Sequence, residues 1–347
     1  MKSDSYSNLK QQWDHKLPFV LYSLPYQKQC TAYLQNDDRL LTDVQLQKTG
    51  FVFGGFDMEN QLYIIEGDNE LVLDEFTYNE DAVEFSISDQ GDKKSHISTV
   101  QKAVEHIKNS ALEKVVIARS VTAHLKGHPL AVYSKLYHKY PNAFTYCFYH
   151  PMIGLWFGAS PELLVSTTNS NFKTVSLAGT RWAELSDSWG TKEIEEQQLV
   201  TTYIKSRLDD LDLSYQYTDV QTIKAGHLLH LKQEFKGELK SSKLIDLIKA
   251  LHPTPAVCGL PTSVANSFIT VNENLDRSFY AGFMGPISHE NQNAINTSYL
   301  GVNIRCMQVV DDCALLYVGG GITADSDPEL EWEETVKKSQ ILTTVFD

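Results

Sequence analysis

The stretch that decides the fold is residues 319–338, which read GGGITADSDPELEWEETVKK. An apolar run at 314–318 predicts a strand that ends where this stretch begins. Three glycines follow, and glycine lets the backbone turn sharply or approach a ligand closely. Residues 325–327 are candidate helix caps, and Pro328 stands at a predicted first helical position. The stretch therefore predicts a strand, a glycine-rich connection and a helix.

The predicted helix places two carboxylates on one face. Glu331 and Glu334 are three residues apart, and Lys338 lies one further turn along the chain. Carboxylates with a lysine one turn away can hold a hard cation together with the acid group of a substrate. A solvated helix with an ion pair between Glu334 and Lys338 explains the same pattern, and the segment by itself favours this alternative.

The composition is typical of a globular protein. The chain has 347 residues, of which 42% are hydrophobic and 21% charged, enough for a buried core. A net charge of -14 argues against nucleic acid or an anionic membrane as a partner, so an anionic substrate needs local Arg and Lys. No apolar run has the length of a membrane helix or a signal peptide. The cysteines form no CxxC pair and predict reduced thiols in a cytoplasmic protein.

The order of the predicted elements indicates an α/β or α+β protein with few βαβ alternations. Aromatic and β-branched runs predict strands at 18–22, 50–56, 114–120, 143–150, 154–158, 163–165, 173–177, 283–287 and 298–307, with two more within 215–239. Periodic apolar spacing predicts helices at 97–109, 192–211, 244–251 and 264–271. A polar stretch at 88–94 predicts a linker.

Several single residues could take part in catalysis or binding, but each also has an ordinary structural explanation. Lys114 begins a strand, Glu162 stands in a turn before a strand, and Gly179 follows a strand. A surface lysine, an exposed turn carboxylate and a simple turn are the favoured explanations when each residue is taken alone. The glutamates at 193–196 complement the dipole of the helix that they begin. None of these residues indicates a function when taken alone.

Together, these stretches resemble the chorismate-utilising enzymes, which include isochorismate synthases, salicylate synthases and the large subunits of anthranilate and aminodeoxychorismate synthases. The matching pieces occur in the family's order at 114–119, 158–164, 177–181, 196–200, 252–261, 276–282, 304–306 and 319–338. The resemblance implies an α/β (α+β) fold with two large, mostly antiparallel sheets packed in a sandwich and helices outside. It also implies a chorismate-binding catalytic region at 96–347, while the aromatic and β-branched runs before it indicate a strand-rich N-terminal layer of the same fold at 1–95.

The resemblance is closest to the isochorismate synthases. Members that use water as the nucleophile have lysine where Lys114 stands, and members that also eliminate pyruvate have threonine where Ala256 stands. A salicylate synthase is the nearest alternative, and a catalytically inert chorismate-binding protein is another. The resemblance implies a monomer that acts on chorismate without an amidotransferase subunit. It leaves open whether the product feeds menaquinone or siderophore synthesis.

The resemblance also implies an acid, a base and a cofactor. Lys114, when neutral, would remove a proton from water that attacks C2 of chorismate, and protonated Glu162 would donate to the departing C4 hydroxyl. These roles require a lowered lysine pKa and a raised glutamate pKa. The implied cofactor is Mg²⁺, with Glu196 and Glu334 as ligands and Glu331 acting through a coordinated water.

The remaining implied residues contact the substrate. Arg305 and Lys338 would hold carboxylate oxygens, while Gly179 and Gly319 would let backbone amides approach. The other implied pocket residues are Thr180, His252, Ala256 and Tyr280, and core packing explains His252 and Tyr280 nearly as well. The chain departs from the family at Gln197, where members often have histidine directly after the metal-binding glutamate.

Overall fold

The computed structural model describes residues 2–42, 46, 48–67, 69–78, 82–182, 188–225, 228–240, 243–289 and 297–346. The first of its two sheets contains β1 (Phe19–Ser23), β2 (Cys30–Leu34), β5 (Glu70–Leu73), β6 (Glu84–Asp89), β7 (Lys114–Lys126), β8 (Phe144–His150), β9 (Gly154–Ser160), β15 (Gly259–Leu260), β18 (Cys306–Val310) and β19 (Cys313–Ile322). Its order is β15-β7-β19-β18-β9-β8-β1-β2-β5, and β6 also pairs with β7.

The second sheet contains β3 (Gly50–Gly54), β4 (Leu62–Glu66), β10 (Leu163–Thr168), β11 (Asn171–Trp182), β12 (Tyr215–Tyr217), β13 (Gln221–Ala225), β14 (Leu228–Glu238), β16 (Phe283–Ser288) and β17 (Thr297–Val302). Its order is β12-β14-β11-β10-β17-β16-β3-β4, and β13 also pairs with β14. The named strand pairs in both sheets are antiparallel, as the resemblance implies. The strands before residue 95 are divided between the two sheets.

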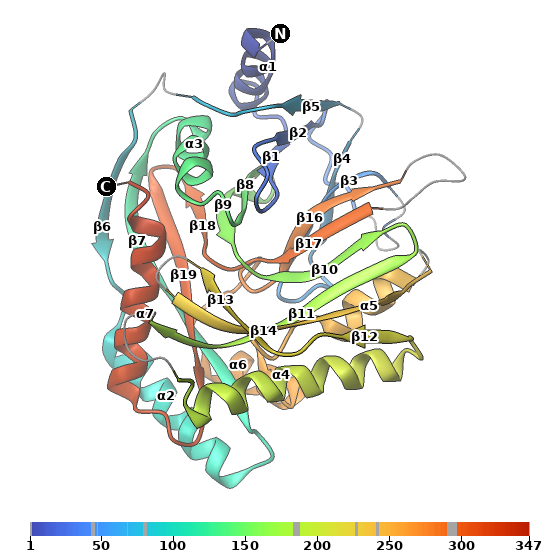
Figure 1. Cartoon of the computed structure of the whole chain (residues 1–347). Coiled ribbons are helices and arrows are strands. Elements are labelled where there is room, and N and C mark those ends of the chain that lie inside the picture. The colour runs from blue at the N-terminus through green and yellow to red at the C-terminus, as the bar shows by residue number, and fades with distance from the viewer. Residues whose placement is uncertain are drawn as a thin grey trace.

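Helices cover the outer faces of the sheets. They are α1 (Lys2–Asp14), α2 (Lys93–Asn109), α3 (Pro129–Lys139), α4 (Thr191–Asp210), α5 (Leu244–Leu251), α6 (Thr262–Asn272) and α7 (Pro328–Thr343). Figure 1 shows α7 beside β19 and α4 along β11 and β14. Asp327 caps α7 by accepting hydrogen bonds from the next two free amides, and Pro328 opens the helix as predicted. In the part of the chain that the structure describes, no helix is long and apolar enough to cross a membrane.

Aromatic side chains fill the space between the sheets. Phe53 of β3 stacks on Phe148 of β8 at 4.3 Å and on Phe279 at 4.5 Å between ring centroids. Trp156 of β9 adds an edge contact with Phe53 at 5.9 Å. Rings of this size bury large apolar areas, so the two inner faces form one core.

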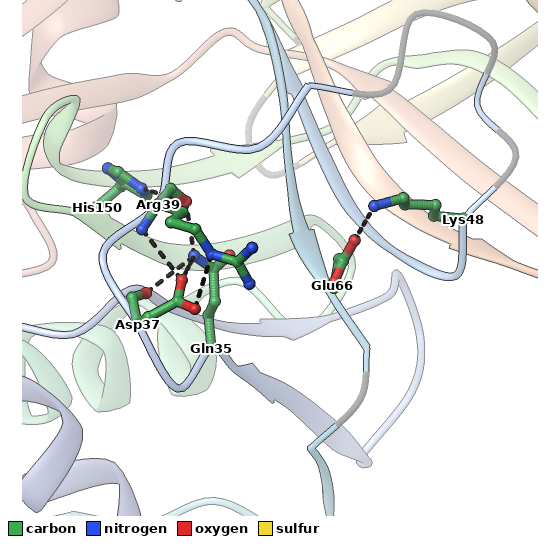
Figure 2. Close-up of polar contacts among 6 residues, drawn as sticks. All are labelled: Gln35, Asp37, Arg39, Lys48, Glu66 and His150. Atoms are coloured by element: carbon green, nitrogen blue, oxygen red, sulfur yellow. Dashed lines mark hydrogen bonds and ion pairs between the residues drawn. The ribbon is translucent and has the colours of Figure 1, made fainter.

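Polar contacts hold the connection that follows β2 (Figure 2). Gln35 Nε2 donates to the Arg39 carbonyl oxygen at 2.7 Å, and Arg39 Nε donates to Asp37 Oδ2 at 2.8 Å. The His150 ring lies 3.4 Å from the same carbonyl oxygen. None of the side chains drawn in Figure 2 lines the cavity described below, so these contacts serve the fold.

The structure corrects three of the predicted element boundaries. β19 does not end at Val318 but continues through the glycines to Ile322, because pairing with β7 keeps Gly319–Gly321 extended. α2 begins at Lys93, inside the predicted linker. The predicted strand at 298–307 is two strands, which are separated near Arg305, where φ is +52°.

The sequence pattern also predicts no helix before residue 97, yet α1 is present. Its apolar positions are Tyr6, Leu9 and Trp13, which pack on the outer apolar cluster of the first sheet. This spacing is compatible with one helical face, but only three apolar residues mark it.

Candidate active site

A cavity of about 290 Å³ lies between strand ends of both sheets, α4 and α7. Its lining comes from β7, β11, β14 and β19, from both helices and from the connections that carry Glu162, Ala256 and Tyr280. The predicted site residues that line it are Lys114, Glu162, Gly179, Glu196, Ala256, Tyr280, Arg305, Gly319, Glu334 and Lys338. The structure thus brings together residues from distant parts of the sequence.

Lys114 is buried at the start of β7, and only 5% of it is exposed. Gly321 of the neighbouring strand leaves room for it, since a Cβ there would lie 2.9 Å from Lys114 Cε and 3.3 Å from Nζ. Burial lowers the pKa of Lys114, and Lys338 and Lys192 lower it further, against Glu196 and Glu162. The net effect favours the neutral amine.

Glu162 lies between β9 and β10 and faces the same cavity. Its backbone is fixed on both sides: its N–H donates to Ser160 Oγ at 3.2 Å, and its carbonyl oxygen accepts from the Val302 N–H at 2.9 Å. Burial raises the pKa of Glu162 to about 7, although Lys114 and Arg305 oppose this effect. The carboxyl therefore keeps its proton up to about neutral pH.

Two cations face the cavity near these groups. Arg305 projects from the connection between β17 and β18, and burial lowers the pKa of its guanidinium. Lys338 of α7 donates to the Gly319 carbonyl oxygen at 3.0 Å and pairs with Glu334 Oε1 at 2.7 Å. These groups provide the positive charge that an anionic ligand requires in a chain of net charge -14.

Carboxylates from two helices also line the cavity. Glu193 and Glu196 come from α4, and Glu334 comes from α7. Burial alone would raise the pKa of Glu334, but the Lys338 ammonium, together with the charges of Lys192 and Lys114, outweighs burial and lowers that pKa. Glu331 is 5% exposed and lies beside the cavity, outside its lining, where its Oε1 accepts from Ser326 Oγ at 2.6 Å.

Gln197, the departure from the family pattern, faces the second sheet. Its Nε2 donates to Ser176 Oγ of β11 at 2.8 Å, and its Oε1 accepts from Thr201 Oγ1 at 2.8 Å. Thr201 is also within hydrogen-bond distance of Gln233 of β14, at 3.0 Å. This buried network attaches α4 to the sheet, while the neighbouring Glu196 faces the cavity.

Two predicted pocket residues are not placed in the cavity. His252 does not line the cavity: its Nε2 lies 3.2 Å from the Phe56 carbonyl oxygen, and its ring contacts Phe283 edge-on at 5.2 Å. The residue belongs to the core, and burial lowers its pKa to about 4. The side chain of Thr180 lies outside the described part of the chain.

Four charged or titratable residues of the lining were not predicted as site residues. They are Lys192, Glu193, His230 and Tyr317. Glu193 is three residues before Glu196 on the same helix face, a spacing that could have revealed it. His230 lies opposite Thr180 in the β11–β14 register, which no local pattern shows. Burial, with Arg305 and Lys338, lowers the pKa of His230 to about 4, so its ring is neutral.

Comparison with known proteins agrees with this geometry. Residues 58–347 match the family model of the chorismate binding enzymes. The chain is 32% identical over 269 residues to the chloroplastic isochorismate synthase of Catharanthus roseus, covering 72% of this chain and 45% of the relative. It is 31% identical over 264 residues to isochorismate synthase DhbC of Bacillus subtilis, covering 69% of this chain and 64% of the relative. The chain thus spans less than two thirds of each relative's length.

A solved structure has the same architecture. MenF, the menaquinone-specific isochorismate synthase from Escherichia coli, aligns with a TM-score of 0.80 over 95% of this chain and 89% of that chain, at 21% identity. At this identity the likeness shows the fold, and the family match over 58–347 shows the relationship. The chain belongs to the family of chorismate binding enzymes.

Proposed function

We propose that this protein is an isochorismate synthase, an isomerase that converts chorismate reversibly to isochorismate. The observation that carries the proposal is the pairing of Lys114 and Glu162 in one cavity. Burial lowers the lysine pKa and raises the glutamate pKa to about 7, as a base and an acid working near neutral pH require.

The chemistry balances with these two groups. The neutral amine of Lys114 takes a proton from a water molecule whose oxygen forms a bond to C2 of the chorismate ring. The ring double bonds shift, the C4–O bond breaks, and protonated Glu162 donates its proton to the departing hydroxyl, which leaves as water. One water enters and one leaves, so the product is an isomer of the substrate.

Other residues of the cavity would position the substrate. Chorismate carries two carboxylates, and Arg305 and Lys338 offer the charge-assisted hydrogen bonds that carboxylates accept. Gly319 keeps the backbone of β19 open to the ligand, since a Cβ there would lie 2.8 Å from the Tyr280 hydroxyl. A side chain at Gly319 would therefore displace Tyr280 from the wall of the cavity.

The donor set of the cavity fits Mg²⁺. The described residues contain no ready-made cluster of three or more His, Cys, Asp or Glu side chains that could hold a metal by themselves. Mg²⁺ commonly takes one or two carboxylates and completes its shell with water and substrate oxygens, so the carboxylates of α4 and α7 suit it. We assign Glu196 and Glu334 as ligands, with Glu331 acting through water. When bound, the ion would supply positive charge to the ring carboxylate.

The deciding experiment is to incubate the purified protein with chorismate, with and without Mg²⁺, and to resolve the products by chromatography. A Mg²⁺-dependent mixture of chorismate and isochorismate is expected. Salicylate and pyruvate would instead show a salicylate synthase, a result that Ala256 argues against by resemblance. Tight binding of chorismate without turnover would show a binding protein.

A further inference from the structure

A buried ion pair, formed by Glu273 and Arg277, lies next to the cavity but outside its lining. Arg277 Nε donates to Glu273 Oε1 and Arg277 Nη2 donates to Glu273 Oε2, both at 2.7 Å. The two side chains are 3% and 2% exposed. Burial alone would lower the pKa of Arg277, but the bound carboxylate outweighs burial and raises it, so the guanidinium stays charged. Neither residue lines the cavity.

The pair completes the edge of β7 where strand pairing stops. β15 pairs with β7 only at its first two residues, and β6 pairs with it from Thr122 onward. Between these points the Ala118 N–H donates to Glu273 Oε2 at 2.8 Å, and Arg277 Nη2 donates to the Val116 carbonyl oxygen at 2.7 Å. The ion pair therefore takes the place of a neighbouring strand close to Lys114, at the start of β7.

The same pair reaches two other walls of the cavity. Arg277 Nη1 donates to the Val257 carbonyl oxygen at 2.9 Å, which fixes the loop that carries Ala256. The Arg277 carbonyl oxygen accepts from the Tyr280 N–H at 2.7 Å and so fixes the turn that places Tyr280. Val257, Ala256 and Tyr280 all line the cavity. One buried group thus links three segments that are distant in sequence.

We infer that Glu273 and Arg277 are positioning residues that hold Lys114, the Ala256 loop and Tyr280 in their relative places for the reaction. This inference rests on the proposed function. A buried ion pair adds little net stability compared with apolar side chains of similar volume, so stability alone gives a weak reason for it. The pair contacts neither Arg305 nor Lys338, so its loss should disturb the base more than the binding of the substrate carboxylates.

The test compares Arg277→Lys with a variant that is destabilised elsewhere. Lysine keeps the charge but cannot make the bidentate contact or reach both carbonyl oxygens. We expect kcat to fall about 10- to 100-fold, because displacement by about 1 Å can cost that much, while KM changes less than about threefold. Leu136→Ala is the control, since Leu136 is fully buried in the separate outer cluster of α3. Leu136→Ala should lower the melting temperature but not kcat, measured well below both transitions.

Equal losses of kcat in Arg277→Lys and Leu136→Ala would overturn the inference. Glu273→Gln, which keeps an acceptor for the Ala118 N–H but removes the charge, serves if Arg277→Lys does not fold, and the same split between kcat and KM is expected. Hydrogen exchange gives an independent readout: protection should be lost selectively in 114–120, 254–260 and 276–282. Unchanged exchange in these segments also refutes the inference. If the wild type does not convert chorismate, the proposed function fails, while the exchange result still decides whether the pair holds these segments.

Discussion

Glu162 should make the protein less stable as the pH rises, and Glu162→Gln should abolish this dependence. Burial raises the pKa of Glu162 from 4.5 to about 7 in the folded state. A raised folded pKa means that the folded protein binds the proton more tightly than the unfolded chain. The resulting stability is fully present below pH 4.5 and is lost as the pH rises through 7. At about 1.4 kcal/mol for each pH unit between these values, the loss is about 3 kcal/mol.

The assay is equilibrium unfolding in urea of the wild type and Glu162→Gln at pH 5 and pH 8. Glutamine has a similar shape and does not titrate, so groups distant from Glu162 largely cancel in the comparison, and only the charges that act on it, Lys114 and Arg305, can add to the difference. We expect the free energy of unfolding of the variant, relative to the wild type, to rise by about 2 to 3 kcal/mol between the two pH values. A difference that stays constant within about 0.5 kcal/mol would refute the argument that burial holds a proton on Glu162.

Four further predictions concern catalysis. The kcat/KM of the wild type should fall about tenfold per pH unit above about 7, as Glu162 of the free enzyme loses its proton, and a flat profile to pH 9 would exclude it as the acid. Lys114→Ala should lower kcat about a thousandfold with chorismate affinity in calorimetry nearly unchanged, and near-normal turnover would exclude it as the base. Glu334→Gln should raise the Mg²⁺ concentration needed for half-maximal activity, whereas an identical Mg²⁺ titration would remove it from the metal site. Gly321→Ala should lower kcat about tenfold, because the new Cβ meets Lys114 Cε at 2.9 Å, and wild-type kinetics would show that this position tolerates displacement.

The elements that the sequence predicts well are those fixed by local pattern. The helix predicted at 192–211 is α4 at Thr191–Asp210, because Val200, Ile204 and Leu208 repeat at a spacing of four residues on its buried face. The continuation of β19 to Ile322 was not predictable from its glycines, because glycine weakens a strand and the compensating partner, β7, is about 200 residues away. Long-range pairing overrides local propensity at that point.

The site residues, like the elements of the fold, divide into those that a sequence motif predicts and those whose positions depend on long-range contacts. Most of the predicted site residues line the cavity. They were predicted from sequence motifs of the family, and such motifs mark residues that are distant in sequence but close together in the fold. The position of His252 in the core was not predictable from the sequence around it, because nothing local indicates its partner, the Phe56 carbonyl oxygen in the N-terminal part. His230 was missed because its place depends on the register between β11 and β14.

The proposed acid and base also explain how one cavity can run the reaction in both directions. The pair has two states with the same number of protons. In one state Lys114 is neutral and Glu162 is protonated, and in the other Lys114 is protonated and Glu162 is ionised. A change of pH therefore does not alter the ratio of these two states. Burial disfavours the charged form of each group and therefore favours the neutral pair, which is the form that the proposed attack of water on chorismate requires. In the proposed mechanism each forward turnover would leave the ionised pair, which is the form that the reaction of isochorismate would require, with Glu162 as base and Lys114 as acid. The desolvation that prepares the forward reaction would then also favour the return of the two groups to their starting protonation state once the product has left.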